Sequence, residues 1–121
     1  MTIGTWALIG VLGGVGAVAR FAVDGLVGER AGGEFPWGTF VVNISGAAAL
    51  GLLVGAAVTG NALLLAGTAA LGSYTTLSTW MFETHRLGQD DQLRIAAANL
   101  VASLFVGFAA VALGHAIGAA L

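Results

Sequence analysis

Four long apolar stretches, separated by short polar segments, make up nearly all of this 121-residue chain. Each stretch is about 20 residues long, which is the length that an α-helix needs to cross the hydrocarbon core of a bilayer. We therefore expect an all-α, multi-pass membrane protein whose single domain covers residues 1–121. The pattern predicts transmembrane helices at residues 3–23, 38–58, 62–82 and 94–113.

The polar segments predict where the chain turns. Asp24 to Pro36 holds charged residues among glycines and indicates a water-facing loop. Pro36 and Trp37 then mark re-entry, because proline is tolerated at a helix start and tryptophan favours the membrane interface. Thr59-Gly60-Asn61 predicts a short turn, and His85 to Gln92 predicts a second loop, after which the last helix frays near His115.

The composition excludes several classes of protein. Hydrophobic residues make up 58% of the chain and charged residues only 8%, whereas a soluble domain is about a quarter charged. Cysteine is absent, so neither disulfides nor thiolate metal sites apply. A pI near 5.4 argues against a nucleic-acid partner. The N-terminus has no basic segment and its apolar run exceeds signal-peptide length, so we expect it to be a retained span.

The third apolar stretch contains an unexpected cluster of glycine and hydroxyl residues, from Gly72 to Thr79. A helix in hydrocarbon must satisfy its own backbone, and glycine with serine and threonine lets it break while side chains or ions take the freed carbonyls. The sequence therefore predicts a helix broken near residues 72–79, with an ion at the break.

Polar residues also interrupt the other three stretches, and each has two interpretations. Arg20 is either an interfacial residue that extends its charge to water or an element of an ion vestibule. Asn43 either joins two helices by hydrogen bonds or donates its NH₂ group to an anion. Asn99 and Ser103 share one helix face, which indicates either a wet track or a packing stripe.

The residues indicate no enzyme. The two histidines lie at loop positions, and no span contains paired carboxylates. The glycines from Gly14 to Ala19 superficially resemble a dinucleotide-binding turn, but no short strand precedes them. A small multidrug-type transporter is an alternative, although it needs a carboxylate in the first span, which has none before Asp24. A structural subunit without transport would leave the hydroxyl cluster unexplained.

Three linked motifs resemble the Fluc/CrcB family of fluoride channels. They are Gly13-Gly14-Val-Gly16-Ala-Val-Ala-Arg20 in the first span, Pro36-Trp-Gly-Thr-Phe-Val-Val-Asn43-Ile-Ser-Gly46 in the second, and Gly72-Ser-Tyr-Thr75-Thr-Leu-Ser-Thr79-Trp80-Met-Phe-Glu83 in the third. The resemblance covers nearly the whole chain in order and spacing. It implies passive export of fluoride across the plasma membrane, which lowers cytoplasmic fluoride.

The resemblance also implies an assembly and a set of site residues. The subunits form an antiparallel dimer, with two fluoride pathways at the interface and a sodium ion at the centre. Backbone carbonyls at the break hold the sodium ion and correspond to Gly72 and Thr75. The pathway then includes Arg20, Asn43, Leu77, Thr79, Trp80, Asn99 and Ser103.

This sequence departs from the family at three of those positions. Leu77 and Trp80 replace two pore phenylalanines, and Asn99 replaces a tyrosine of the fourth span. An aromatic ring offers an anion its positive edge, which leucine lacks. Trp80 keeps a ring edge and adds an indole N–H donor. Leu77 therefore predicts weak conduction or the loss of one of the two pathways.

The four basic side chains predict the orientation of the chain. Arginines 20, 30, 86 and 94 all fall at or near the side of the two charged loops, and none lies at the side of the termini. Positive residues near span ends favour the cytoplasm, so the termini should lie outside. An antiparallel homodimer needs half its copies inverted, so we expect the partner to be either a second copy or an inverted paralogue, with this chain as a possible non-conducting subunit.

Overall fold

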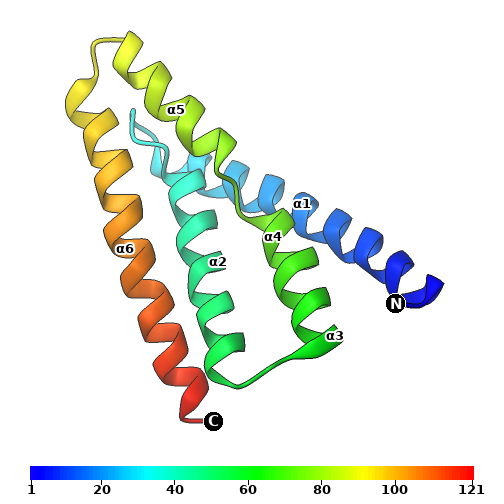
Figure 1. The fold of residues 1–121 in the computed structure, drawn as a ribbon. Coiled ribbons are helices and arrows are strands. Elements are labelled where there is room, and N and C mark those ends of the chain that lie inside the picture. The colour runs from blue at the N-terminus through cyan, green and yellow to red at the C-terminus, as the bar shows by residue number, and fades with distance from the viewer.

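The computed structural model describes residues 1–121, and the chain is helical with no strands (Figure 1). Three helices are long and apolar enough to cross a membrane. They are α1 (Ile3–Ala31), α2 (Trp37–Gly55) and α6 (Leu93–Ala119). A fourth, interrupted path consists of α3 (Gly60–Leu63), the π-helix η1 (Leu64–Leu71), α4 (Gly72–Tyr74) and α5 (Ser78–Gln89).

Three helices are longer than the sequence predicted. α5 continues to Gln89, so the predicted loop from His85 to Gln92 is mostly helical. α1 continues to Ala31, so the predicted loop from Asp24 to Pro36 is mostly helical. No proline interrupts this segment, and α1 ends only at Gly32, whose positive φ of 63° is a conformation that glycine adopts readily. α6 likewise includes His115, where fraying was expected. The second span was predicted to start at residue 38, and α2 begins one residue earlier, directly after Pro36.

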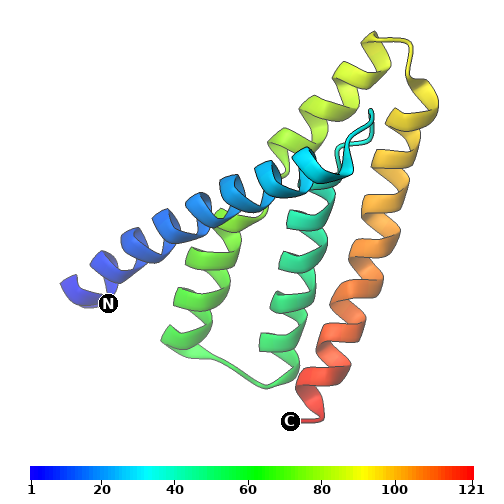
Figure 2. The same cartoon turned by 180° about the vertical axis from the view of Figure 1, so that it is seen from behind.

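α2 and α6 lie side by side along their length, as both ribbon views show (Figures 1 and 2). Glycines make this close approach possible. A Cβ atom at Gly51 would collide with the Val111 carbonyl, and one at Gly114 would collide with the Ala48 carbonyl. α1 crosses the interrupted path at a steep angle, where Gly16 lies against the Ala70 carbonyl. Small residues thus let backbones pack directly against one another.

The interrupted path confirms the predicted break and narrows its location. Gly72 still belongs to a helical turn, whereas Thr75 is extended, with φ −78° and ψ 161°. The helix resumes at Ser78. The wide π-helix η1, which the sequence did not predict, comes directly before the break.

Most large apolar side chains face outward. Only 14 of the 121 residues are buried, and side chains such as Phe21, Phe105 and Phe108 are largely exposed. A soluble monomer rarely exposes so much continuous apolar surface. Lipid or a second subunit can cover these faces, which agrees with a multi-pass membrane protein.

The ends of the elements fall into two groups. The loop between α1 and α2 and the turn between α5 and α6 lie at one end of the molecule (Figure 1). The α2–α3 connection and the C-terminus lie at the other end, and the N-terminus lies in that same half. At the first end the rings of Phe35, Trp37 and Phe40 pack together, with centroids 4.6–5.7 Å apart. Aromatic clusters of this kind are typical of a membrane interface.

Candidate ion pathway

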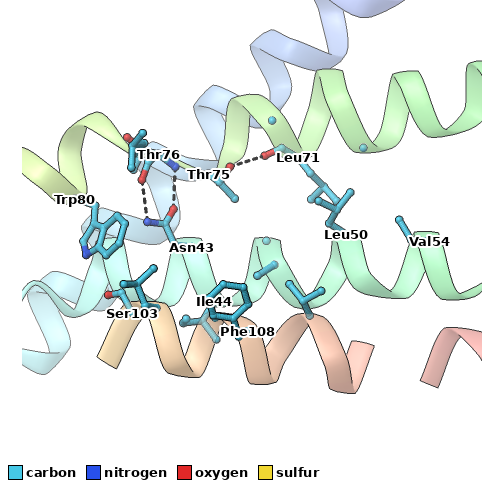
Figure 3. A pocket seen from close by; sticks show the side chains of 18 of the residues that line it. Asn43, Ile44, Leu50, Val54, Leu71, Thr75, Thr76, Trp80, Ser103 and Phe108 are labelled. Atoms are coloured by element: carbon cyan, nitrogen blue, oxygen red, sulfur yellow. Dashed lines mark hydrogen bonds between the residues drawn. The ribbon is translucent and has the colours of Figure 1, made fainter. Parts of the chain in front are cut away.

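A groove with a volume of about 660 Å³ runs between α2, the interrupted path and α6 (Figure 3). Most of its lining is apolar, including Leu50, Val54 and Phe108. Six of the residues that the sequence predicted for the site also line this groove: Asn43, Gly72, Thr75, Leu77, Trp80 and Ser103. Residues from three separate segments of the chain are therefore brought to one surface.

Asn43 of α2 binds the backbone of the break. Its Nδ2 donates to the Thr76 carbonyl at 2.8 Å, and its Oδ1 accepts from the Thr76 N–H at 2.8 Å (Figure 3). This pair of bonds satisfies the peptide groups that the broken helix leaves without partners. The structure thus favours the helix-joining interpretation of Asn43. One of its two Nδ2 hydrogens remains for a second acceptor at the groove.

The break also releases two backbone carbonyls. In an uninterrupted α-helix the Gly72 and Thr75 carbonyls would accept from the N–H groups four residues later. The Thr76 N–H donates to Asn43 instead, and the Thr79 N–H donates to the Thr76 Oγ1 at 3.2 Å. Both carbonyls that the sequence predicted as cation ligands therefore lose their regular helical donors.

Ser103 lines the groove from α6, and its hydroxyl oxygen is buried. The residue is only 9% exposed, and its Oγ has no hydrogen-bond partner within the chain. A buried hydroxyl without a partner is uncommon, so the Ser103 hydroxyl is a candidate to receive an ion or a water molecule. Gly107, one turn further along α6, also lines the groove.

Trp80 lines the groove with its ring, but its indole N–H is already hydrogen-bonded within the subunit. The indole Nε1 donates to the Asn99 carbonyl at 3.1 Å. Asn99 is fully buried and does not line the groove, and its Nδ2 donates to the Thr84 Oγ1 at 2.8 Å. The indole donor predicted for the pathway is therefore directed at α6 in this chain.

The remaining predicted residues lie outside the groove. Thr79 is half-buried in the first turn of α5. Arg20 is half-buried on α1, and its Nε has no hydrogen-bond partner. A second, more polar hollow of about 310 Å³ lies by the α1–α2 loop, lined among others by Asp24 and Glu83.

Three residues of interest escaped the sequence analysis. Thr76 provides the peptide group that Asn43 binds, and Thr84 bonds to both Asn99 and the Trp80 carbonyl. Thr39 is 1% exposed, and its Oγ1 has no partner. Thr39 stands one helical turn before Asn43, so an i, i+4 search for polar pairs on α2 would have found it.

A family model described as CrcB-like protein, Camphor Resistance (CrcB), matches residues 7–115. The chain belongs to this family. The match includes all four helical paths and every residue that we assigned to the pathway. The relatives described next are named ion channels and not enzymes, in agreement with the absence of a catalytic pattern in the sequence.

Similar proteins cover almost the whole chain. A protein of Mycolicibacterium paratuberculosis named Fluoride-specific ion channel FluC 2 is 55% identical over 114 residues, which are 94% of this chain and 93% of the relative. A protein of Mycobacterium bovis with the same name is 50% identical over 95% of this chain and 91% of its own length. A protein of Symbiobacterium thermophilum named Fluoride-specific ion channel FluC 1 is 42% identical over 94% of this chain and 97% of its own length.

Proposed function

We propose that this chain is the subunit of a fluoride-selective channel that lets fluoride leave the cell passively across the plasma membrane. The groove beside the helix break carries the proposal, because it brings Asn43, Ser103 and the threonines of the break to one mostly apolar surface. The names of relatives that are 42–55% identical supply the identity of the ion.

The chemistry of the lining suits a small anion in transit. Stripping water from fluoride in a low-dielectric medium costs tens of kcal/mol, so donors must replace hydration along the way. Ser103, Asn43 and the edge of the Trp80 ring each offer weak, neutral partners. Neutral donors let the ion leave again, whereas a deep pair of basic side chains would hold it.

A sodium ion at the break is the second part of the proposal. The Gly72 and Thr75 carbonyls are hard oxygen ligands without regular helical donors, which is the donor set that sodium prefers. A bound cation would supply a positive potential beside the groove. No side chain of the groove carries a positive charge.

An antiparallel dimer is the third part, with a second copy or an inverted paralogue as the partner. In one subunit the groove is open, and Leu77 at its side is 67% exposed. The polar pair of Ser45 Oγ and Tyr74 OH, 2.9 Å apart, is also exposed. Exposed hydroxyls and an open groove at membrane depth are covered by a partner subunit more favourably than by lipid.

Fluoride efflux from liposomes, read with a fluoride electrode, tests the channel. We expect purified protein to release fluoride but not chloride, and Ser103→Ala to lower the rate. Ser78→Ala is the matched control, because Ser78 is exposed and does not line the groove. Proton-coupled uptake of lipophilic cations without fluoride flux would support the multidrug-type transporter instead.

Reporter fusions at Leu121 test the choice of partner. With all four arginines at the side opposite the termini, we expect the reporter mostly outside. That result favours an inverted paralogue in the cell. Equal signals from the two sides would indicate dual topology and a homodimer.

A further inference from the structure

Two hydrogen bonds between α5 and α6 and one within α5 form a closed ring. The Trp80 Nε1 donates to the Asn99 carbonyl at 3.1 Å, the Asn99 Nδ2 donates to the Thr84 Oγ1 at 2.8 Å, and the Thr84 hydroxyl donates to the Trp80 carbonyl at 2.8 Å. Each residue donates once and accepts once. The three bonds therefore run in the same direction around the ring. Removal of the Thr84 hydroxyl or of the Asn99 side-chain amide breaks the ring.

The hydrogen-bond ring determines which edge of the Trp80 indole faces the groove. Because the N–H points to α6, the indole nitrogen lies on the side of the ring away from Asn43 (Figure 3). The carbon edge of the ring is left to line the groove. An aromatic C–H edge is weakly positive, whereas a free indole N–H is a stronger donor.

Packing alone does not account for Asn99. The residue is 0% exposed, and its Oδ1 has no hydrogen-bond partner. A buried, unpartnered oxygen is unfavourable, and an apolar residue of similar size would avoid it. What asparagine adds here is the Nδ2 donor to Thr84.

We propose that Thr84 and Asn99 are positioning residues that hold Trp80 with its carbon edge, and not its N–H, toward the ion. This inference rests on the proposed fluoride pathway. Thr84 lies outside the groove. Its bond with the Asn99 side chain holds α6 beside α5, so the main-chain carbonyl of Asn99 stays within reach of the indole N–H. The same ring keeps Asn99 away from the ion, so Asn99 contributes through its hydrogen bonds to Thr84 and Trp80.

Two variants of Thr84 separate positioning from packing. In a background with Trp6→Phe and Trp37→Phe, Trp80 is the sole tryptophan. Thr84→Val keeps the shape but removes the hydroxyl, and Thr84→Ser keeps the hydroxyl. Thr84→Val removes both hydrogen bonds of the Thr84 hydroxyl. We expect it to speed deuterium exchange of the indole N–H and to lower fluoride efflux by at least about fivefold. Thr84→Ser should retain both properties.

The indole N–H resonance of the parent protein gives a second test that does not depend on any Thr84 variant folding. We expect this resonance to stay in place when fluoride is added, because the N–H does not meet the ion. A large fluoride-dependent shift, or reduced efflux in Thr84→Val with unchanged indole exchange, would overturn the proposal. If the parent protein carries no fluoride at all, the proposed function fails, while the exchange data still report on the hydrogen-bond ring.

Discussion

The α2–α6 pair and the interrupted path meet the same requirement in different ways. In hydrocarbon every backbone polar group needs a partner. α2 and α6 satisfy theirs within each helix and then pack backbone against backbone at glycines such as Gly51 and Gly114. The interrupted path leaves peptide groups open, and a side chain of another helix, Asn43, satisfies those of Thr76.

The difference teaches where an ion site can form. A glycine-packed pair leaves no backbone polar group open, so it serves as a support that carries side chains such as Asn43 and Ser103 to the groove. A break that is held by one amide side chain has carbonyls and hydroxyls to offer, yet it is stabilised by only a few hydrogen bonds. The stability of the α2–α6 pair should therefore depend on close packing, and the stability of the break should depend on hydrogen bonds.

The largest effect is expected at the α2–α6 contact. Gly114→Ala places a methyl group against the Ala48 carbonyl, and backbone cannot move aside as a side chain does. We expect a loss of at least about 2–3 kcal/mol of stability, from overpacking. Thermal unfolding followed by circular dichroism in detergent measures it. Gly14→Ala is the control, because a Cβ there meets nothing within 4 Å.

The next effect concerns the bond between α2 and the break. Asn43→Leu keeps the bulk but leaves the Thr76 N–H and carbonyl without partners, which should cost about 2–3 kcal/mol and abolish most fluoride efflux. The same unfolding assay and liposome efflux report both losses. Ser78→Ala is the control, because Ser78 is exposed and does not line the groove, and it should stay within about 0.5 kcal/mol of wild type. Full activity in Asn43→Leu would mean that the break needs no partner.

Gly72→Val should affect assembly more than folding. Within one subunit a Cβ at Gly72 meets only the Gly67 carbonyl, at an ordinary 3.8 Å. The Cβ atom therefore meets no clash inside the subunit. We expect the valine side chain to crowd a second subunit and to weaken the dimer roughly tenfold, or about 1.4 kcal/mol. Dilution series with single-molecule subunit counting measure this. Thr75→Ala should be mild, since the Thr75 hydroxyl donates to the Leu71 carbonyl of its own turn.

The smallest expected effect is an increase in the rate of fluoride efflux. Leu77→Phe adds an aromatic edge to the groove, where an anion has a weakly positive surface to approach. We expect fluoride efflux to rise about two- to fivefold, a change of less than about 1 kcal/mol in the barrier. Met81→Phe is the control, because Met81 is exposed on α5 but does not line the groove. If both variants raised fluoride efflux equally, the increase would come from packing of the added ring in the membrane and not from its contact with the ion.

The sequence by itself determined the membrane class, the four helical paths and the position of the break. These are local properties: the length of an apolar run sets a span, and glycine with hydroxyl residues marks where a helix can open. The end of α1 was missed because charge was taken as a loop signal, while the chain from Asp24 to Ala31 has nothing to stop a helix before Gly32.

Only the tertiary structure decided which polar groups are free. Asn43 binds Thr76 across 33 positions of sequence, and the Trp80 N–H reaches the Asn99 carbonyl across 19. Each donor and acceptor has a limited number of bonds, so whether it can serve an ion depends on what the fold has already placed beside it. Such pairings follow from helix packing and not from local pattern, which is why the indole N–H was assigned to the pathway from sequence and is directed at α6 in the fold.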